Sequence, residues 1–162
     1  MKRIHFLTLG FIATVSLLAT SCEREYITEE YYTEYGSKVY TREYAIRGDE
    51  WQEGYYGDGR KYLFAECEDP DITNNVVNKG AVLVYYWFMY DAETNSCSWN
   101  MLPYVYPFLY TNEAGDTLAL GENFRFEYEK GLITFVVEDL NSDMPFPMGD
   151  ETIFKVVAIE NR

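Results

Sequence analysis

Histidine is nearly absent from this chain, whose one histidine, His5, lies close to the N-terminus. A Ser-His-Asp triad and a His-ligated metal site both need an imidazole that the mature protein keeps. The segment around His5 has the pattern of a signal peptide, which is removed, so the mature chain would lack both kinds of site. The sequence therefore predicts a protein that is not an enzyme and that needs no cofactor.

Basic residues are scarce as well. The 162 residues include 13 Lys and Arg against 27 Asp and Glu, which gives a formal net charge of -14. A nucleic-acid binder needs the opposite sign, so no nucleic-acid partner is expected. Hydrophobic residues make up 48% of the chain and aromatic residues 18%, which excludes global disorder and supplies the core of one domain.

A hydrophobic run long enough to span a membrane is also missing. The apolar stretch from Ile4 to Leu18 has about 15 residues, whereas a spanning helix needs roughly 20. Lys2 and Arg3 precede this stretch and small residues follow it. This is the three-part pattern of a signal peptide.

The end of that segment, Leu18-Ala19-Thr20-Ser21-Cys22, resembles the lipobox of bacterial lipoproteins. The resemblance implies that residues 1–21 are removed as a signal peptide and that Cys22 is the lipidation site. Two or three acyl chains bind a membrane stably, since each buried methylene contributes about 0.8 kcal/mol. An ordinary secretory signal followed by an incidental cysteine is the alternative.

Residues 22–37 are rich in Glu and Tyr and have one aliphatic residue, Ile27, so they are predicted to be an acidic flexible tether. A tyrosine-based binding strip is the alternative interpretation. Glu23-Arg24-Glu25 directly follows the lipidation site and resembles the export signal of Bacteroidetes surface lipoproteins. The resemblance implies a lipid-anchored protein of the outer membrane, on the cell surface or otherwise on the periplasmic face.

The remainder, residues 38–162, is predicted to be a single β-sandwich domain. Alternating or continuous apolar segments between turn signals indicate strands, and two of these, 117–120 and 123–128, are expected to be separate. The run 81–90 has the composition of a central strand covered on both faces, which places Tyr85 and Trp87 in the core. The other expected strands are 39–46, 61–68, 97–102, 104–111, 132–139 and 152–159.

One short helix is expected over 70–79, with Asp69 as its N-cap, Pro70 in its first turn and Gly80 at its end. About eight strands with one helix predict an all-β fold, a two-sheet β-sandwich. A closed or partly open β-barrel is the alternative.

Several segments resemble a group of small Bacteroidetes lipoproteins of unknown function. They are Tyr40 to Trp51, Asp71-Ile72-Thr73, Gly80 to Tyr85 and Trp99 to Tyr104. The resemblance implies a lipobox signal peptide and an all-β domain. It implies no activity and no catalytic residues.

Two small groups of residues could carry chemistry. Cys67 and Cys97 can form a disulfide in an oxidising compartment, or can be two buried free thiols. A disulfide requires the strand of Cys67 to run parallel to 81–90, because otherwise the two thiols lie at opposite ends. Four carboxylates are a weak candidate for a calcium site, since a solvated turn with a helix cap explains them without a metal. They are Glu66, Glu68, Asp69 and Asp71.

Exposed aromatic side chains are the last candidate site. Trp51, Tyr55 and Tyr56 lie in a Gly-rich turn region, where they are expected to reach solvent. Flat aromatic faces stack on sugars, and amphipathic rings favour protein interfaces. The sequence thus predicts a non-enzymatic binding or assembly module that contacts an envelope protein. Glycan binding through these three aromatics is the alternative.

Overall fold

The structure is a computed structural model, and it describes residues 29–32, 36–91, 93, 96–112, 114–140 and 151–161. Almost all of the regular structure in these residues is β-strand. The elements are β1 (Glu29–Tyr32), β2 (Lys38–Arg47), the 3-10 turn η1 (Gly48–Glu50), β3 (Gln52–Tyr55), β4 (Lys61–Glu68), α1 (Asn74–Lys79), β5 (Ala81–Asp91), β6 (Ser96–Met101), β7 (Tyr104–Thr111), β8 (Thr117–Glu129), β9 (Leu132–Asp139) and β10 (Glu151–Glu160).

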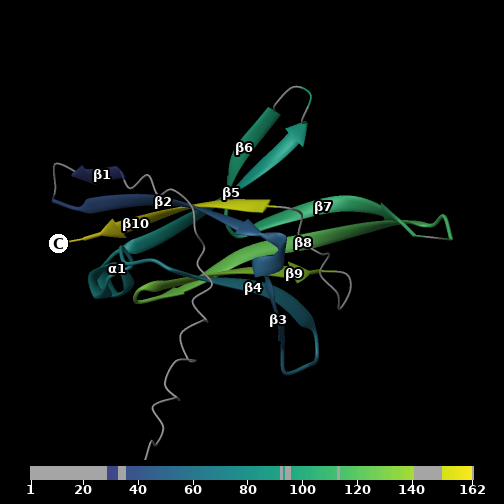
Figure 1. Cartoon of the computed structure of the whole chain (residues 1–162), viewed down its shortest axis with the longest axis horizontal. Coiled ribbons are helices and arrows are strands. Elements are labelled where there is room, and N and C mark those ends of the chain that lie inside the picture. The colour runs from purple at the N-terminus through teal and green to yellow at the C-terminus, as the bar shows by residue number, and fades with distance from the viewer. Residues whose placement is uncertain are drawn as a thin grey trace, which may run out of the picture.

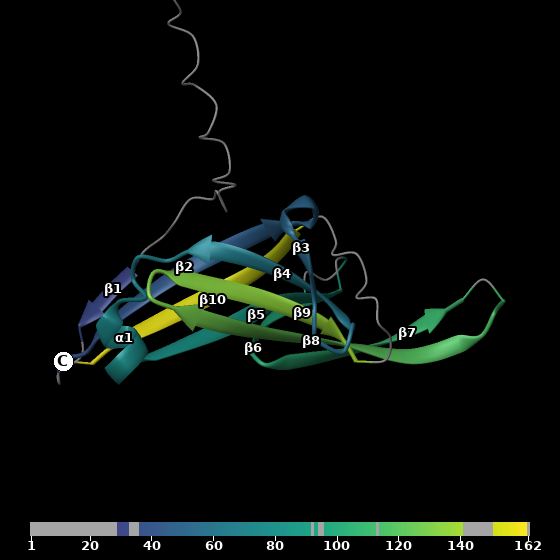
Figure 2. The ribbon, with the colours of Figure 1, turned by 90° about the horizontal axis from the view of Figure 1, so that it is seen from below.

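The strands form two antiparallel sheets that pack face to face (Figures 1 and 2). Sheet A has the order β1-β2-β10-β5-β6, and sheet B has the order β3-β4-β9-β8-β7. The edge strands β6 and β7 follow one another in the chain but belong to different sheets. The all-β sandwich prediction is therefore confirmed, and the described strands do not close into a barrel.

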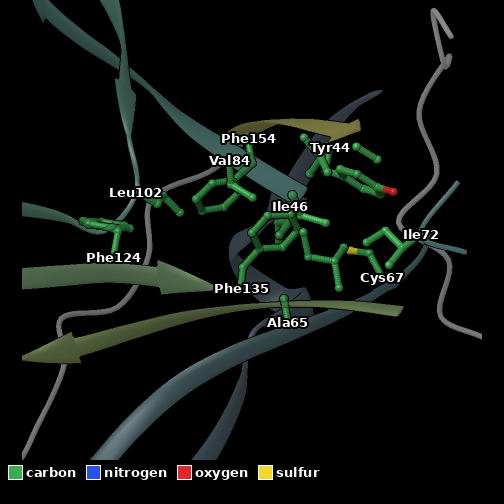
Figure 3. Packing of buried hydrophobic residues seen from close by; sticks show 14 of the residues in the cluster. Tyr44, Ile46, Ala65, Cys67, Ile72, Val84, Leu102, Phe124, Phe135 and Phe154 are labelled. Atoms are coloured by element: carbon green, nitrogen blue, oxygen red, sulfur yellow. The ribbon is translucent and has the colours of Figure 1, made fainter. Parts of the chain in front are cut away.

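The core lies between the sheets and is built from alternate residues of each strand, as the two-residue period of a strand requires. Phe135 of β9 stacks on Phe154 of β10 across the two sheets, with ring centroids 4.2 Å apart (Figure 3). Tyr44 of β2 packs against the same Phe135 ring at 5.6 Å. All three rings are almost fully buried, so aromatic contacts between sheets dominate the centre of the domain.

The helix α1 closes one end of the sandwich by placing Val76, which is fully buried, in the core. It begins later than predicted, because its N-cap is Thr73, whose hydroxyl accepts the Val76 backbone N–H at 3.2 Å. Asp69 caps a preceding turn instead, accepting the Asp71 backbone N–H at 3.0 Å. Within the described residues, no helix is long and apolar enough to cross a membrane.

Three further differences from the sequence prediction change the strand pattern. β1 pairs with β2 although it lies in the predicted tether, so this part of residues 22–37 belongs to sheet A. The predicted strands 117–120 and 123–128 are one continuous strand, β8, that pairs with two neighbours. The turn region after β2 contains the additional strand β3. Each difference arises because pairing with a neighbouring strand outweighs local composition.

Candidate interaction surface

The outer face of β5 and β6 carries a group of aromatic and sulfur-containing side chains. Val82 and Val84 point into the core, so alternate residues of β5 point outward from sheet A. The antiparallel register sets three outward residues of β5 opposite three of β6, as the pairs Tyr85–Met101, Trp87–Trp99 and Met89–Cys97. We name these six side chains the Trp face.

The Trp face is reachable from solvent. Met101 is 56% exposed, and Met89 is 38% exposed. The prediction that both faces of 81–90 are covered, with Tyr85 and Trp87 in the core, is wrong, because a two-sheet sandwich buries only one face of each sheet. Trp, Tyr and Met are the residue types that are enriched where proteins dock.

One cation, Lys155, lies beside the Trp face and contacts two neighbouring side chains. Lys155 of β10 is the neighbour of Tyr85 across the strands. Its ammonium lies 3.8 Å from the centre of the Trp99 ring, and 3.7 Å from the Glu43 carboxylate. The cation–π contact fixes the orientation of the Trp99 ring, which makes the surface more rigid for a partner.

The predicted aromatic site does not form one exposed patch. Trp51 packs against the core, with its ring edge toward Phe154, and its buried indole N–H has no hydrogen-bond partner in the described residues. Tyr55 is 64% exposed. Tyr56 is only partly exposed, and it folds back over sheet B. Only Tyr55 thus remains a largely exposed ring, and its hydroxyl donates to Glu53 Oε2 at 3.4 Å.

Tyr56 belongs to a polar cluster on the outer face of sheet B. Its hydroxyl donates to Glu138 and accepts a hydrogen bond from Arg125 Nη2 at 2.8 Å. Arg125 Nε donates to Glu138 Oε1 at 2.6 Å, and Asn123 Nδ2 donates to Glu138 Oε2 at 3.2 Å. Both carboxylate oxygens therefore have partners within the chain. The cluster holds the segment around Tyr56 on the sheet and leaves little capacity to bind a ligand.

The electrostatics of this cluster agree with a structural role. Burial of the Glu138 carboxylate acts to raise its pKa, but hydrogen bonds from its three neighbours outweigh burial and hold the pKa below its usual value. Burial, together with the hydrogen bond to Glu138, raises the pKa of Tyr56. The tyrosine thus stays a neutral donor, and the carboxylate stays ionised.

The four candidate calcium ligands do not converge. Glu66 and Glu68 project from the exposed side of β4, whereas Asp69 is buried with only 1% of its surface exposed. Arg42 forms ion pairs with both aspartates. Its Nη2 lies 2.7 Å from Asp71 Oδ2, and its Nε lies 3.8 Å from Asp69 Oδ1. Among the described residues no group of three or more metal-ligating side chains could hold an ion. Asp69 and Asp71 therefore belong to a turn that is held by ion pairs with Arg42.

Neither interpretation of Cys67 and Cys97, a disulfide or two buried free thiols, is correct. Cys97 is exposed and carries a free thiol, whereas Cys67 is buried. Cys67 ends β4 near α1, and β5 carries the chain from α1 to Met89, which is paired with Cys97. Eight residues of strand, at about 3.3 Å each, separate the two ends by roughly 26 Å. The third cysteine of the chain, the predicted lipidation site Cys22, lies outside the described residues.

Sequence reasoning missed the Trp face because it took an apolar run as evidence of burial on both sides. The signal that could have found the face is the alternation in 97–101, where Cys, Trp and Met face one way. The polar cluster was missed as well. It could have been found from the predicted hairpin at 129–131, which sets Asn123 opposite Glu138.

Comparison with known proteins adds no relative: no family model matches the chain, and no curated protein or solved structure is significantly similar to it. The resemblance to small Bacteroidetes lipoproteins therefore stays a prediction.

Proposed function

We propose that this chain is a non-enzymatic, lipid-anchored docking module of the bacterial outer membrane, and that it binds a protein through the Trp face. The observation that carries the proposal is the set of three cross-strand pairs on β5 and β6, all aromatic or sulfur-containing and none charged. Exposed patches of this kind mark binding sites, and Trp and Tyr are the residue types that dominate binding energy.

The size of the surface is adequate for the centre of an interface. Leu83 and Val157 extend the outward face beyond the Trp face along β5 and β10. β5 contributes roughly 26 Å of strand from Ala81 to Met89, and the paired parts of β10 and β6 contribute about 16 Å each. At about 4.8 Å per strand, these present about 300 Å² in projection. A standard interface takes about 800 Å² from each partner. The Trp face would thus supply the apolar centre, and neighbouring residues would supply the rim.

Side-chain chemistry favours a protein over a glycan. Sugar hydroxyls need several hydrogen-bonding side chains around a stacking ring. The Trp face contains no carboxylate, amide or guanidinium group, and its neighbour Lys155 is already held by Trp99 and Glu43. The predicted glycan-binding aromatics are dispersed, with Trp51 against the core and Tyr56 in a saturated cluster. Glycan binding is therefore the weaker candidate.

Lipid anchoring at Cys22 is the second element of the proposal. The lipobox-like sequence before Cys22 supports it. The net charge of -14 disfavours adsorption of the domain itself to an anionic membrane, so the lipid would be the attachment. Acylation uses the thiol of Cys22, so an acylated Cys22 cannot also form a disulfide. The bond state of Cys22 therefore tests the anchor directly.

Purification of the tagged full chain from detergent-extracted membranes of its native host tests the docking surface. We expect one stoichiometric protein partner, whose yield falls at least tenfold in Met101→Asp and in Trp99→Ala. Tyr55→Ala is the matched control, because Tyr55 is an exposed aromatic outside the Trp face, and it is expected to keep the partner. Thermal melts of each variant establish that it is folded.

A polysaccharide panel titrated against the same purified chain tests the alternative. We expect no saturable binding. Saturable binding that Tyr55→Ala or Tyr56→Phe weakens, without any partner that depends on Met101, would replace the docking proposal with glycan binding.

A further inference from the structure

A hairpin arm extends from sheet B beyond the body of the sandwich. β9 pairs with β8 only from Glu122 onward, and the Leu140 backbone N–H donates to the Gly121 carbonyl at 2.8 Å, so residues 117–120 of β8 pair with β7 alone among the described residues. We name residues 108–111 and 117–120 the arm. Four residues of strand project about 13 Å, and both ribbon views show the β7–β8 hairpin standing out from the other strands (Figures 1 and 2).

The arm is apolar on both of its sides. Leu109 is 76% exposed and lies opposite Ala119, so both occupy one side of the ribbon. Leu118, 47% exposed, lies opposite Tyr110 on the other side. The strand segments 104–111 and 117–121 contain no charged residue. A two-stranded ribbon has little stability of its own, so a partner that covers both sides would stabilise this one.

Addition of a strand to the β7 edge is disfavoured. β7 is the outermost strand of sheet B, and Pro107 lies in its middle. Proline has no backbone N–H to donate to an incoming strand, which is why it is found on protected edges. The exposed apolar side chains on both sides of the arm are the contacts that it offers to a partner.

The negative charge of the chain and of the arm's tip indicates a partner with a basic surface. Asp116 lies in the turn at the arm's tip, and the whole chain has a net charge of -14. An acidic tip disfavours insertion into an anionic lipid surface, and like charge disfavours a second copy of the chain. A protein with an apolar groove and a basic rim is complementary to both the ribbon and its tip.

We propose that the arm inserts into an apolar groove of a partner protein whose rim carries lysine or arginine. This docking element is separate from the Trp face, because it is built by strands of the other sheet.

Photo-crosslinking in membranes of the native host tests the proposal. A photoreactive amino acid replaces Leu109 or Leu118 in the full chain, and Val77 of α1, 38% exposed, is the matched control position. We expect a protein adduct at both arm positions with at least tenfold lower yield at Val77. The cross-linked peptide should combine apolar residues with flanking Lys or Arg. Asp116→Lys, or 0.5 M salt, should lower the yield several-fold.

Other outcomes overturn the proposal. An adduct of twice the chain mass would identify a second copy, and a lipid adduct would identify the bilayer. Three further results would each show that the arm has no basic-rimmed partner. They are equal adduct yields at Val77 and Leu109, the absence of any adduct, and an adduct yield that Asp116→Lys leaves unchanged.

Discussion

At the scale of single residues, two arginine side chains hold segments of irregular structure against the sheets. Arg42 ties Asp69 and Asp71 in the turn before α1. Arg125 joins Tyr56 to Glu138 on the outside of sheet B. Each contact uses residues of a ligand site that the sequence indicated, since two of the four calcium candidates pair with Arg42 and one predicted binding aromatic pairs with Arg125.

Glu138→Gln tests the structural role of the polar cluster. Because the pKa of Glu138 is lowered in the folded state, its ionised form stabilises the fold at pH above the unfolded value of about 4.3. That stabilisation is lost as the pH falls through the lower folded pKa. We expect a loss of about 1–2 kcal/mol in the free energy of unfolding at pH 7. The difference in the free energy of unfolding between Glu138→Gln and the wild type, measured by urea titration, should be smaller near pH 3 than at pH 7.

The matched control for this measurement is Glu129→Gln, which changes an exposed glutamate at the end of β8. Its effect should stay within about 0.5 kcal/mol at either pH. A Glu138→Gln effect no larger than that of the control would show that the cluster contributes nothing to the fold.

At the scale of elements, the sequence predicted most strands but not all of their relationships. β4, β7 and β9 have the predicted bounds, because alternation and turn residues define them locally. β1 and β3 were not predicted, since their composition is polar and each exists by pairing with one neighbour. The outward orientation of Trp87 also depended on sheet order, which no local pattern contains. The core was thus more predictable than the candidate site.

Gly80→Ala tests the junction between α1 and β5. A Cβ atom at Gly80 would lie 1.9 Å from the backbone oxygen of Ile159, and that oxygen cannot move without shifting β10. We expect a loss of about 2 kcal/mol or more in the free energy of unfolding, measured by urea titration. Gly57→Ala is the control, because a Cβ there meets nothing within 4 Å, and a change below about 0.5 kcal/mol is expected. Equal effects of the two substitutions would contradict the close packing of α1.

At the scale of the whole molecule, the chain combines a predicted anchor, a folded domain and two exposed apolar surfaces. The sandwich buries its aromatic core, and it displays the Trp face on sheet A and the arm on sheet B. The predicted anchor at Cys22 would hold this domain at a membrane, and the acidic composition would keep the domain off the lipid surface. A docking protein anchored in this way would meet its partner within the envelope, and two separate surfaces would allow it to bridge two proteins.

Mass spectrometry of the mature protein's N-terminal peptide, without reduction, tests the proposed membrane anchor. We expect the mature chain to begin at Cys22 and this residue to carry a diacylglyceryl group. Wild-type protein should partition with membranes, and Cys22→Ala should prevent the modification. A chain that starts elsewhere, or a Cys22 joined to Cys67 by a disulfide, would contradict the anchor and with it the placement of the docking surfaces at a membrane.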